Sequence, residues 1–374
     1  MEGNKKTIKT AVVGCGAISD IYFTNMIGKY SSVDVVACCA KHIESAQRKA
    51  DKYGIRACTY EEILADDSIA MVVILTPAPT HYELIEQALR AGKHVFTEKP
   101  LTDKLEDAGE LVRLADEKGL YLGAAPETFL GACFQTARKA IDDGLIGEVT
   151  SFNICANRDL TMLASLFRML RMPGGGICYD YGVYYLTALI SLLGPIDQVF
   201  AFADNRQRIR TNILPQSPEY GKEYIYDNES RVFALLQLEN GIRGNLTLDG
   251  ESIFTDIGTF MIYGTKGVLK LGDANQFGSP ISYMANDYDF SNWGKYNWIP
   301  LENISSLTDD SRGIGPAVMA RSIMYGKKNP ASKEMAYHVL DTVCQIMKSS
   351  DTGRIEKVES TCERPEALAN WEEV

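Results

Sequence analysis

Short apolar runs rich in β-branched residues recur through the first third of the chain, and an amphipathic segment follows most of them. The apolar runs predict buried strands at Ile8–Val13, Val33–Cys39, Met71–Leu75 and His94–Thr97. The amphipathic segments predict helices that end near Ile27, span Glu44–Tyr53 and span Thr80–Ala91. Strands that alternate with helices are typical of a parallel sheet covered on both faces. Residues 1–126 are therefore predicted to form an α/β Rossmann domain with a doubly wound parallel sheet.

From residue 127 onward, the β-rich runs follow one another instead of alternating with helices. They predict strands at Val149–Asn157, Val199–Ala203, Ser230–Leu238, Ile242–Asp249, Gly258–Gly264 and Val268–Leu271. Helices are predicted at Phe134–Asp142, Arg312–Tyr325 and Glu334–Ser349. This order predicts that residues 127–374 form an α+β domain with a large, mainly antiparallel open sheet. Asp204–Glu229 and Ala285–Asp310 are long and weakly periodic, so they are interpreted as substrate lids or oligomer arms, with both alternatives open.

Residues Pro173–Pro195 join a glycine run to a helical pattern. Glycine and proline disfavour a helix interior, so Gly174–Gly176 is predicted to be a tight loop, with a helix that begins near Asp180. At about 100° per residue, Asp180 and Tyr184 project from one side of this helix. The same side carries Thr187 and Ser191, and the opposite apolar stripe consists of Leu186, Leu189, Ile190 and Leu193. Two interpretations stay open: a functional pair, or a solvated polar face with Tyr184 as a half-buried core residue.

The first predicted strand ends in GCGAIS, which precedes a predicted helix. In this context Gly14 makes the tight turn, Gly16 allows the backbone to approach a pyrophosphate, and the helix start supplies N–H donors. Ser19 stands where a third glycine is usual. The motif predicts a bound dinucleotide, with Ala17 and Ile18 also at the pyrophosphate.

The end of the second predicted strand bears on the choice between NAD and NADP. An acidic residue there accepts hydrogen bonds from ribose hydroxyls, whereas a basic residue accommodates a 2′-phosphate. Ala40 occupies the acidic position and Lys41 follows it. The cofactor is therefore predicted to be NAD or NADP, with a lean toward NADP.

Two further strand ends carry candidate chemistry. The loop after Met71–Leu75 contains Pro77 and Pro79 and lies at the carboxyl edge of the sheet, where α/β folds bind ligands. The next strand ends in Glu98, Lys99 and Pro100. A lysine at this edge can lower the pKa of a nearby phenol. The alternative is an ordinary surface lysine ahead of a helix.

Composition narrows the class of partner. The 374 residues are 45% hydrophobic and carry a net charge of −11, which disfavours nucleic acid and anionic membranes. No basic and apolar leader is present and the apolar runs are too short to span a bilayer, so a cytoplasmic protein with a small-molecule substrate is expected. The nine scattered cysteines without CxxC spacing and the four histidines predict reduced thiols and no metal site.

Three separated motifs together resemble the Gfo/Idh/MocA family of oxidoreductases. They are GCGAIS, PAPTHYELIEQALRAGKHVFTEKPL and GGGICYDYGVYYLTALISLLGP, and the segments GAAPETFLGACFQTARKAIDDGLIGEV and YGTKGVLKL extend the resemblance over almost the whole chain. The resemblance implies that Lys99, Asp180 and Tyr184 form the catalytic set, with tyrosine where many members have histidine. It also implies a homodimer or higher homo-oligomer formed through the open face of the second-domain sheet. The segment NRDLTMLASLFRMLRM departs from the family pattern and leaves the substrate open.

The sequence therefore predicts an NAD(P)-dependent oxidoreductase that transfers a hydride between nicotinamide and a ring or anomeric hydroxyl of a sugar or glycoside. Two alternatives stay open: redox-assisted cleavage of a glycoside with retained cofactor, and a non-catalytic nucleotide-binding sensor. The predicted cofactor-binding residues are Gly14, Gly16, Ala17, Ile18, Ala40, Lys41, Thr76, Pro77, His81, Glu98 and Lys99. The predicted substrate-binding residues are Lys99, Glu127, Arg158, Asp180 and Tyr184, and Arg168 and Arg171 are further candidates.

Overall fold

The computed structural model describes residues 7–252, 258–285 and 297–368, which divide into two compact units. Unit 1 contains residues 7–130, 310–337 and 368, and unit 2 contains the described residues of 131–309 and 338–367. The predicted boundary at residues 126 and 127 lies close to the first of these divisions. The return of residues 310–337 to unit 1 differs from the prediction, which gave all of 127–374 to the second domain.

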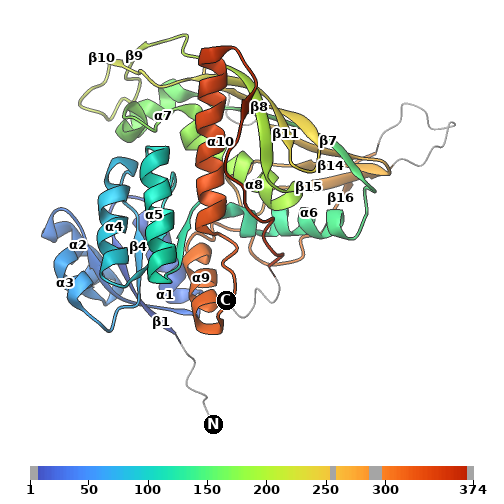
Figure 1. Ribbon diagram of the computed structural model, residues 1–374. Helices are drawn as coiled ribbons and strands as arrows, with labels where there is room; N and C mark the ends of the chain where they lie inside the picture. The colour runs from blue at the N-terminus through green and yellow to red at the C-terminus, as the bar shows by residue number, and fades with distance from the viewer. Residues whose placement is uncertain (1–6, 253–257, 286–296, 369–374) are drawn as a thin grey trace. The chain divides into compact units, whose positions relative to one another are not determined.

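Unit 1 is built on a six-stranded parallel sheet in the order β3-β2-β1-β4-β5-β6. Its strands are β1 (Ile8–Val13), β2 (Val33–Cys39), β3 (Arg56–Ala57), β4 (Met71–Ile74), β5 (His94–Thr97) and β6 (Leu122–Ala124). Its first five helices are α1 (Ser19–Gly28), α2 (Ile43–Tyr53), α3 (Tyr60–Ala65), α4 (His81–Arg90) and α5 (Leu105–Lys118), and Figure 1 shows α4 beside α5. The predicted doubly wound parallel sheet is confirmed.

Local sequence explains where these elements begin and end. All four residues of β4 are buried, as its continuous apolar run predicts for a central parallel strand. α3 begins at a capping box in which Thr59 and Glu62 exchange side-chain and backbone hydrogen bonds. α2 and α5 each end at a glycine in the left-handed conformation, Gly54 and Gly119.

The helix α9 (Ile314–Tyr325) belongs to unit 1 because polar contacts join its approach segment to α1. The Asn25 side-chain amide donates to the carbonyl oxygens of Asp310 and Arg312, at 2.9 and 2.7 Å. The Tyr30 hydroxyl donates to the Ser311 carbonyl at 2.6 Å. These contacts connect residues nearly 300 positions apart. The following helix α10 (Lys333–Thr352) contains the boundary between the two units.

Unit 2 contains a nine-stranded sheet in the order β16-β15-β14-β13-β7-β12-β11-β8-β17. Its strands are β7 (Val149–Asn157), β8 (Ile196–Asp204), β11 (Arg231–Leu238), β12 (Arg243–Asp249), β13 (Thr259–Gly264), β14 (Gly267–Leu271), β15 (Ile281–Ala285), β16 (Ile299–Pro300) and β17 (Glu356–Lys357). Within the described residues of this nine-stranded sheet, only the β7–β12 pair is parallel. The prediction of a mainly antiparallel sheet is confirmed. Asn240 and Gly241 lie in the turn between β11 and β12, where the Gly241 N–H donates to the Leu238 carbonyl at 2.9 Å.

The two faces of this sheet differ in what covers them. On one face, the rings of Phe134 in α6 (Ala132–Asp142) and Tyr185 in α8 (Val183–Leu193) pack against Phe260 of β13. On the other face, Phe202 pairs across β8 and β11 with Phe233, and Leu235 is 62% exposed. Large exposed apolar side chains at neighbouring positions are unusual for a face that only water covers.

Two segments of unit 2 are those that the sequence analysis interprets as substrate lids or oligomer arms. Within Asp204–Glu229, β9 (Ile209–Thr211) and β10 (Glu223–Ile225) form a separate antiparallel pair. Residues 286–296 of Ala285–Asp310 lie outside the described residues, so that part of the interpretation stays a prediction.

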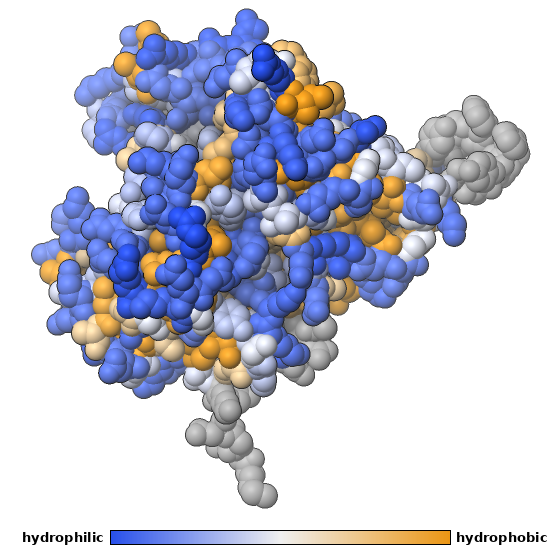
Figure 2. Space-filling view, in the orientation of Figure 1, coloured by the Kyte–Doolittle hydropathy of each residue, from blue (hydrophilic) through white to orange (hydrophobic). Residues whose placement is uncertain are grey.

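Polar and charged side chains cover most of the face that Figure 2 shows, with apolar atoms in smaller groups between them. This agrees with a net charge of −11 spread over the chain. Within the described part of the chain, none of the helices combines the length and the apolar character that crossing a membrane requires.

Candidate functional site

The glycine turn after β1 has one open side. Gly14 has a φ of +105°, and a Cβ there would lie 2.9 Å from the Leu75 backbone, so only glycine suits this position. Apart from its own chain neighbours, a Cβ added at Gly16 would meet no atom of the described residues within 4 Å. Ser19, at the start of α1, donates from its hydroxyl to the Gly16 carbonyl at 2.7 Å. The turn is thus fixed by its own hydrogen bonds while Gly16 faces free space that can admit a pyrophosphate.

The residues around this turn lie where a dinucleotide could reach them. Ala17 and Ile18 are exposed at the start of α1. Gly14 donates its N–H to the carbonyl of Cys39, the last residue of β2, at 2.9 Å, so the end of β2 borders the turn. Ala40 follows, and the side chain of Lys41 is exposed.

His81 links the two loops at the carboxyl edge of the sheet. Its ring is fully buried, with one nitrogen 2.8 Å from the Thr76 carbonyl and the other 2.8 Å from the Pro100 carbonyl. Burial lowers the pKa of His81, and the two carbonyl contacts oppose this effect. Both ring nitrogens are occupied by backbone, so His81 supports the loops that carry Thr76, Pro77 and Lys99.

Glu98 connects the end of β5 to α1, a link that the sequence did not reveal. Its carboxylate accepts a hydrogen bond from the Tyr22 hydroxyl at 2.8 Å and another from the Lys99 N–H at 3.1 Å. Burial, together with the charges of Glu127 and Glu98, raises the pKa of Tyr22, which keeps this hydroxyl protonated as a donor. The backbone of Lys99 is therefore held by the residue before it.

Glu127 is held by backbone amides. Its carboxylate accepts from the N–H groups of Gly313 and Gly315, at 2.7 and 2.5 Å, where α9 begins, and the residue is 2% exposed. Burial raises its pKa to about 7. Glu127 thus stabilises the start of α9. It joins the first segment of unit 1, which ends at residue 130, to the segment 310–337. Its contact with the substrate stays a prediction.

In unit 2, the predicted helix start has an unusual form. Asp180 lies in a π-helical turn, η4 (Cys178–Gly182), which leads directly into α8. Wider turns of this kind are rare and occur frequently at functional sites. Every residue of α8 is buried, including Thr187 and Ser191, so the interpretation of a solvated polar face is wrong. The buried Ser191 hydroxyl has a hydrogen-bond partner within the helix, because it donates to the Ala188 carbonyl at 2.8 Å.

Asp180 and Tyr184 are presented differently within this segment. Asp180 is half-buried, and its N–H donates to the Gly176 carbonyl at 2.8 Å. Tyr184 is 9% exposed, and its ring centroid lies 6.4 Å from that of Tyr181. A carboxylate and a phenol one helical turn apart can orient a hydroxyl group and accept its proton.

Arg158, a predicted substrate-binding residue, interacts electrostatically with Asp180. Its guanidinium carbon is 3.8 Å from the centroid of the Tyr181 ring. Burial lowers the pKa of Arg158, but electrostatic interactions with Tyr181, Asp180 and Asp273 outweigh burial and raise it. The structure therefore brings together Arg158 and Asp180, which the sequence placed more than 20 residues apart.

A cluster of two tyrosines and one carboxylate supports this group and was not predicted. The hydroxyls of Tyr181 and Tyr185 donate to one oxygen of Asp273, at 3.0 and 3.1 Å, and lie 3.0 Å from each other. Burial is the largest cause that raises the pKa of Tyr181 to about 12. Asp273 lies in the loop after β14, so no local pattern links it to η4.

The glycine run is filled by the protein's own chain. A Cβ at Gly175 would lie 2.4 Å from the Leu170 carbonyl oxygen, and one at Gly176 would lie 1.9 Å from a carboxylate oxygen of Glu229. Gly174 has a φ of +79°. Gly175 and Gly176 are therefore packed from within and leave no space for a side chain.

The arginines ahead of the glycine run make structural contacts. Arg168 and Arg171 both pair with Glu219. The Arg171 guanidinium also stacks on the Tyr224 ring at 3.8 Å and donates to the Ala164 carbonyl at 2.8 Å. These contacts join η3 (Arg168–Arg171) to the β9–β10 pair.

The sequence matches two domain descriptions from one family. Residues 8–125 match the NAD-binding Rossmann fold of an oxidoreductase family, and residues 134–270 match the GFO/IDH/MocA C-terminal domain. A dTDP-3,4-didehydro-2,6-dideoxy-alpha-D-glucose 3-reductase of Actinomadura kijaniata is 31% identical over 68% of this chain and 71% of its own length. An uncharacterised oxidoreductase of Schizosaccharomyces pombe is 33% identical over 54% of this chain and 56% of its own length.

A further relative and a solved structure extend the comparison. The scyllo-inositol 2-dehydrogenase (NADP(+)) IolW of Bacillus subtilis is 26% identical over 52% of this chain and 54% of its own length. The chain thus spans about half the length of several curated relatives. The structure of a levoglucosan dehydrogenase in complex with NADH and L-sorbose has the same fold, with a TM-score of 0.81 at 18% identity, over 95% of this chain and 99% of that one.

Proposed function

Since the chain belongs to the Gfo/Idh/MocA family of oxidoreductases, we propose that it transfers a hydride between a ring hydroxyl of a sugar or glycoside and a nicotinamide dinucleotide. One observation carries the proposal. Unit 1 has a glycine turn with an open side at Gly16, and unit 2 has Asp180 beside Arg158, one helical turn before Tyr184. The first arrangement suits a pyrophosphate, and the second suits a hydroxyl that gives up a proton.

The residues of unit 1 fit a dinucleotide, because the space at Gly16 adjoins the start of α1 and its N–H groups. When bound, nicotinamide supplies the acceptor or donor of the hydride. The residues proposed to bind it are Gly14, Gly16, Ala17, Ile18, Ala40, Lys41, Thr76, Pro77, Glu98 and Lys99. His81 supports this set by holding the Thr76 and Pro100 carbonyls.

We propose Lys99, Asp180 and Tyr184 as the catalytic set. The Tyr184 phenol accepts the proton of the sugar hydroxyl through its deprotonated form. The Lys99 ammonium stabilises that phenolate, because an adjacent positive charge favours the ionised partner. Asp180 and Arg158 bind further hydroxyls of the sugar and orient the ring for transfer from the carbinol carbon.

The test is Tyr184→Phe. Removing a positioned proton acceptor lowers turnover by about 10²- to 10⁴-fold, and the dinucleotide Kd should stay unchanged. Turnover is followed by nicotinamide absorbance with a panel of pyranoses, inositols and glycosides, and Kd by fluorescence titration. Tyr179→Phe is the matched control, since Tyr179 lies in η4, directly before α8, and its hydroxyl is 3.8 Å from the Cys344 sulfur. Equal turnover in the Tyr184 variant and the wild type would show that Tyr184 is not the proton acceptor.

The same panel separates the alternatives. Release of aglycone from a glycoside, with no net change in nicotinamide absorbance, would replace the proposed oxidation by redox-assisted cleavage. Nucleotide binding without turnover of any polyol would replace it by a sensor function.

The open face of the unit 2 sheet supports a homo-oligomer. Phe202, Phe233 and Leu235 are 61, 41 and 62% exposed on neighbouring strands β8 and β11. Burying such side chains against a second copy is favourable by about 25 cal/mol per Å² of apolar area. We propose this face as the contact between copies, and Leu235→Asp should lower the molar mass in light scattering.

A further inference from the structure

The glycine run and η4 are held by one short segment, residues 226–229, which we call the brace segment. The Tyr226 hydroxyl donates to the Gly175 carbonyl at 3.0 Å. The Asn228 side-chain amide donates to the Leu170 and Met172 carbonyls, at 3.0 and 2.8 Å. These bonds satisfy carbonyl oxygens in a stretch that forms neither a strand nor a long helix.

Glu229 ends the brace segment and binds the start of η4. Its carboxylate accepts the Cys178 N–H at 2.9 Å, and its own carbonyl accepts the Ile177 N–H at 3.1 Å. The space for that carboxylate is the space a side chain at Gly176 would occupy. Glu229 as a whole is half-buried, so it is the carboxylate end that lies against the glycine run.

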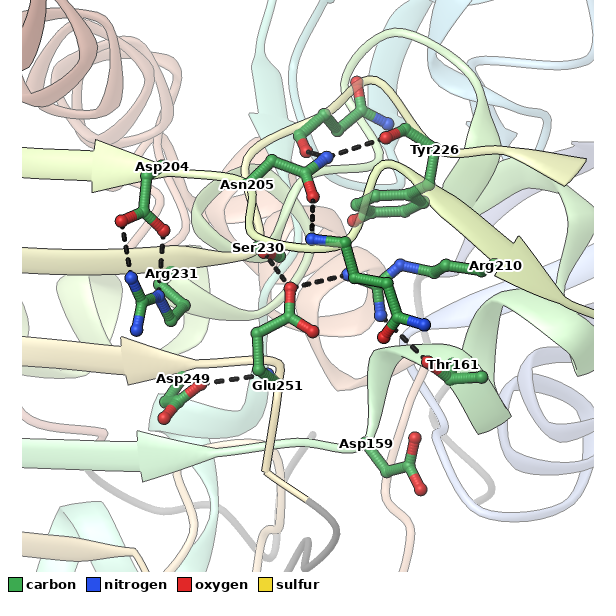
Figure 3. A network of polar contacts seen from close by, with 12 residues as sticks. Asp159, Thr161, Asp204, Asn205, Arg210, Tyr226, Ser230, Arg231, Asp249 and Glu251 are labelled. Atoms are coloured by element: carbon green, nitrogen blue, oxygen red, sulfur yellow. Dashed lines mark hydrogen bonds and ion pairs between the residues drawn. The ribbon is translucent and has the colours of Figure 1, made fainter.

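A network of polar contacts holds the brace segment in place (Figure 3). The fully buried Arg210 lies beside the Tyr226 ring, 4.8 Å from its centroid, and pairs with Glu251 at 2.7 Å. Asn205 donates to the Tyr226 carbonyl at 2.6 Å, and Ser230 bonds to Glu251. Because these bonds hold both ends of the brace segment, we expect a substitution at Glu229 to displace η4 more than the brace segment.

We propose that Glu229 is a positioning residue that holds the π-helical turn and thereby sets the position of Asp180. Asp180 follows the Cys178 contact by two residues, and its own N–H is bonded to Gly176, the residue against which Glu229 packs. This inference rests on the proposed function, in which Asp180 orients the sugar.

The electrostatic surroundings of Glu229 give the proposal a pH signature. The titratable groups in η4 that interact with it are Cys178, Tyr179 and Asp180, and Tyr226 does so from the brace segment. Burial is the largest cause that raises the pKa of Glu229 to about 7, and the Asp180 charge adds to it. Above that pH a second negative charge stands beside Asp180, whereas glutamine at this position stays neutral.

The experiment compares Glu229→Ala and Glu229→Gln with the wild type. The alanine variant should lose about 10- to 100-fold in kcat with an unchanged dinucleotide Kd, because a small misplacement of a reacting group has effects of this size. The glutamine variant should restore most of this loss at pH 6. Above pH 7 the wild-type carboxylate is ionised and accepts the Cys178 N–H more strongly than an amide oxygen does. The ratio of the variant's kcat to that of the wild type should therefore fall between pH 6 and pH 8.

Tyr226→Phe is the matched control, because it removes one bond of the brace segment without removing a group that titrates near neutrality. Its kcat ratio to the wild type should not change with pH. A pH-independent ratio for Glu229→Gln, or an alanine variant with wild-type kcat, would overturn the proposal.

Backbone amide exchange tests the same proposal without turnover. In mass spectrometry, Glu229→Ala should lose about 10-fold or more of the protection in residues 177–185, and Glu229→Gln should keep it. If the wild type oxidises no polyol, the proposed function fails, and exchange still decides whether Glu229 holds the turn. Unchanged protection in the alanine variant would overturn the positioning role even in an active enzyme.

Discussion

The chain uses a glycine-rich segment ahead of a helix twice, and the two segments have opposite physical roles. In unit 1, Gly16 faces open space, since among the described residues no atom beyond the glycine and its chain neighbours lies within 4 Å of the point where its Cβ would stand. In unit 2, the corresponding space at Gly176 holds the Glu229 carboxylate, and that at Gly175 holds the Leu170 backbone. The first segment leaves room for a ligand, whereas the second is packed from within.

The difference shows that glycine in a functional motif can serve the fold as directly as the ligand. The Gly14–Gly16 turn is held by the Gly14 N–H bond to Cys39 of β2 and by bonds from Ser19 to the Gly16 carbonyl, and it keeps one side open. The Gly174–Gly176 run needs the brace segment, because η4 is short and its carbonyl and N–H groups require partners from outside. The first segment should therefore respond to substitution through binding, and the second through stability and positioning.

The largest effect is expected from Gly176→Ala. The added methyl group would overlap the Glu229 carboxylate, so either that side chain or η4 must move. Overpacking of this kind costs about 1–3 kcal/mol, and loss of the Cys178 contact should lower kcat as in Glu229→Ala. Thermal unfolding should show a lower Tm, and fluorescence titration should show an unchanged dinucleotide Kd. The matched control is Gly221→Ala, at a left-handed glycine with open space around it, which should lower Tm without lowering kcat. A wild-type Tm and kcat for Gly176→Ala would contradict the packed role.

Much of the fold follows from local patterns. Ile8–Val13 and Val149–Asn157 were predicted with the bounds that β1 and β7 have, because burial on one or both faces writes a short period into the sequence. The prediction placed α9 in the second domain, since its membership of unit 1 depends on bonds such as that from Gly313 to Glu127, 186 residues away. α5 and β6 were not predicted, and β6 has only three residues, which are too few to show a period.

The candidate site divides in the same way. The turn at Gly14 and Gly16 and the pair Asp180 and Tyr184 were proposed from short motifs, and their roles stay proposals. Glu229 could not be found from sequence, because its partner Cys178 lies 51 residues earlier and nothing in a lone glutamate marks such a contact. The only signal in the sequence was Gly176 itself, because a required glycine can indicate that another group fills the space of a side chain.

A smaller effect, on binding alone, is expected from Gly16→Ala. The methyl group would enter the open space and, beyond its chain neighbours, meet no atom of the described part of the chain within 4 Å, so Tm should match the wild type. It would stand in the path of a pyrophosphate, and dinucleotide binding should weaken by about 10-fold, or 1.4 kcal/mol. Fluorescence titration and thermal unfolding measure the two quantities on the same sample. A lower Tm with unchanged affinity would show that the two glycine segments are alike and would break the comparison.

The smallest effect is expected from Lys41→Ala, which probes how far the open side of unit 1 extends. Lys41 is exposed after β2, whose last residue accepts the Gly14 N–H, and Ala40 provides no carboxylate for ribose hydroxyls. If a 2′-phosphate lies beside it, the variant loses an exposed ion pair worth about 0.2–1 kcal/mol, or up to about 5-fold in affinity for NADP. Affinity for NAD should stay the same, and added salt should reduce the difference because exposed charges are screened. Lys52→Ala is the control, since Lys52 is paired with Asp20 on the neighbouring helix surface. An equal loss of affinity for NAD and NADP would show that Lys41 does not contact the 2′-phosphate and does not determine which of the two dinucleotides binds.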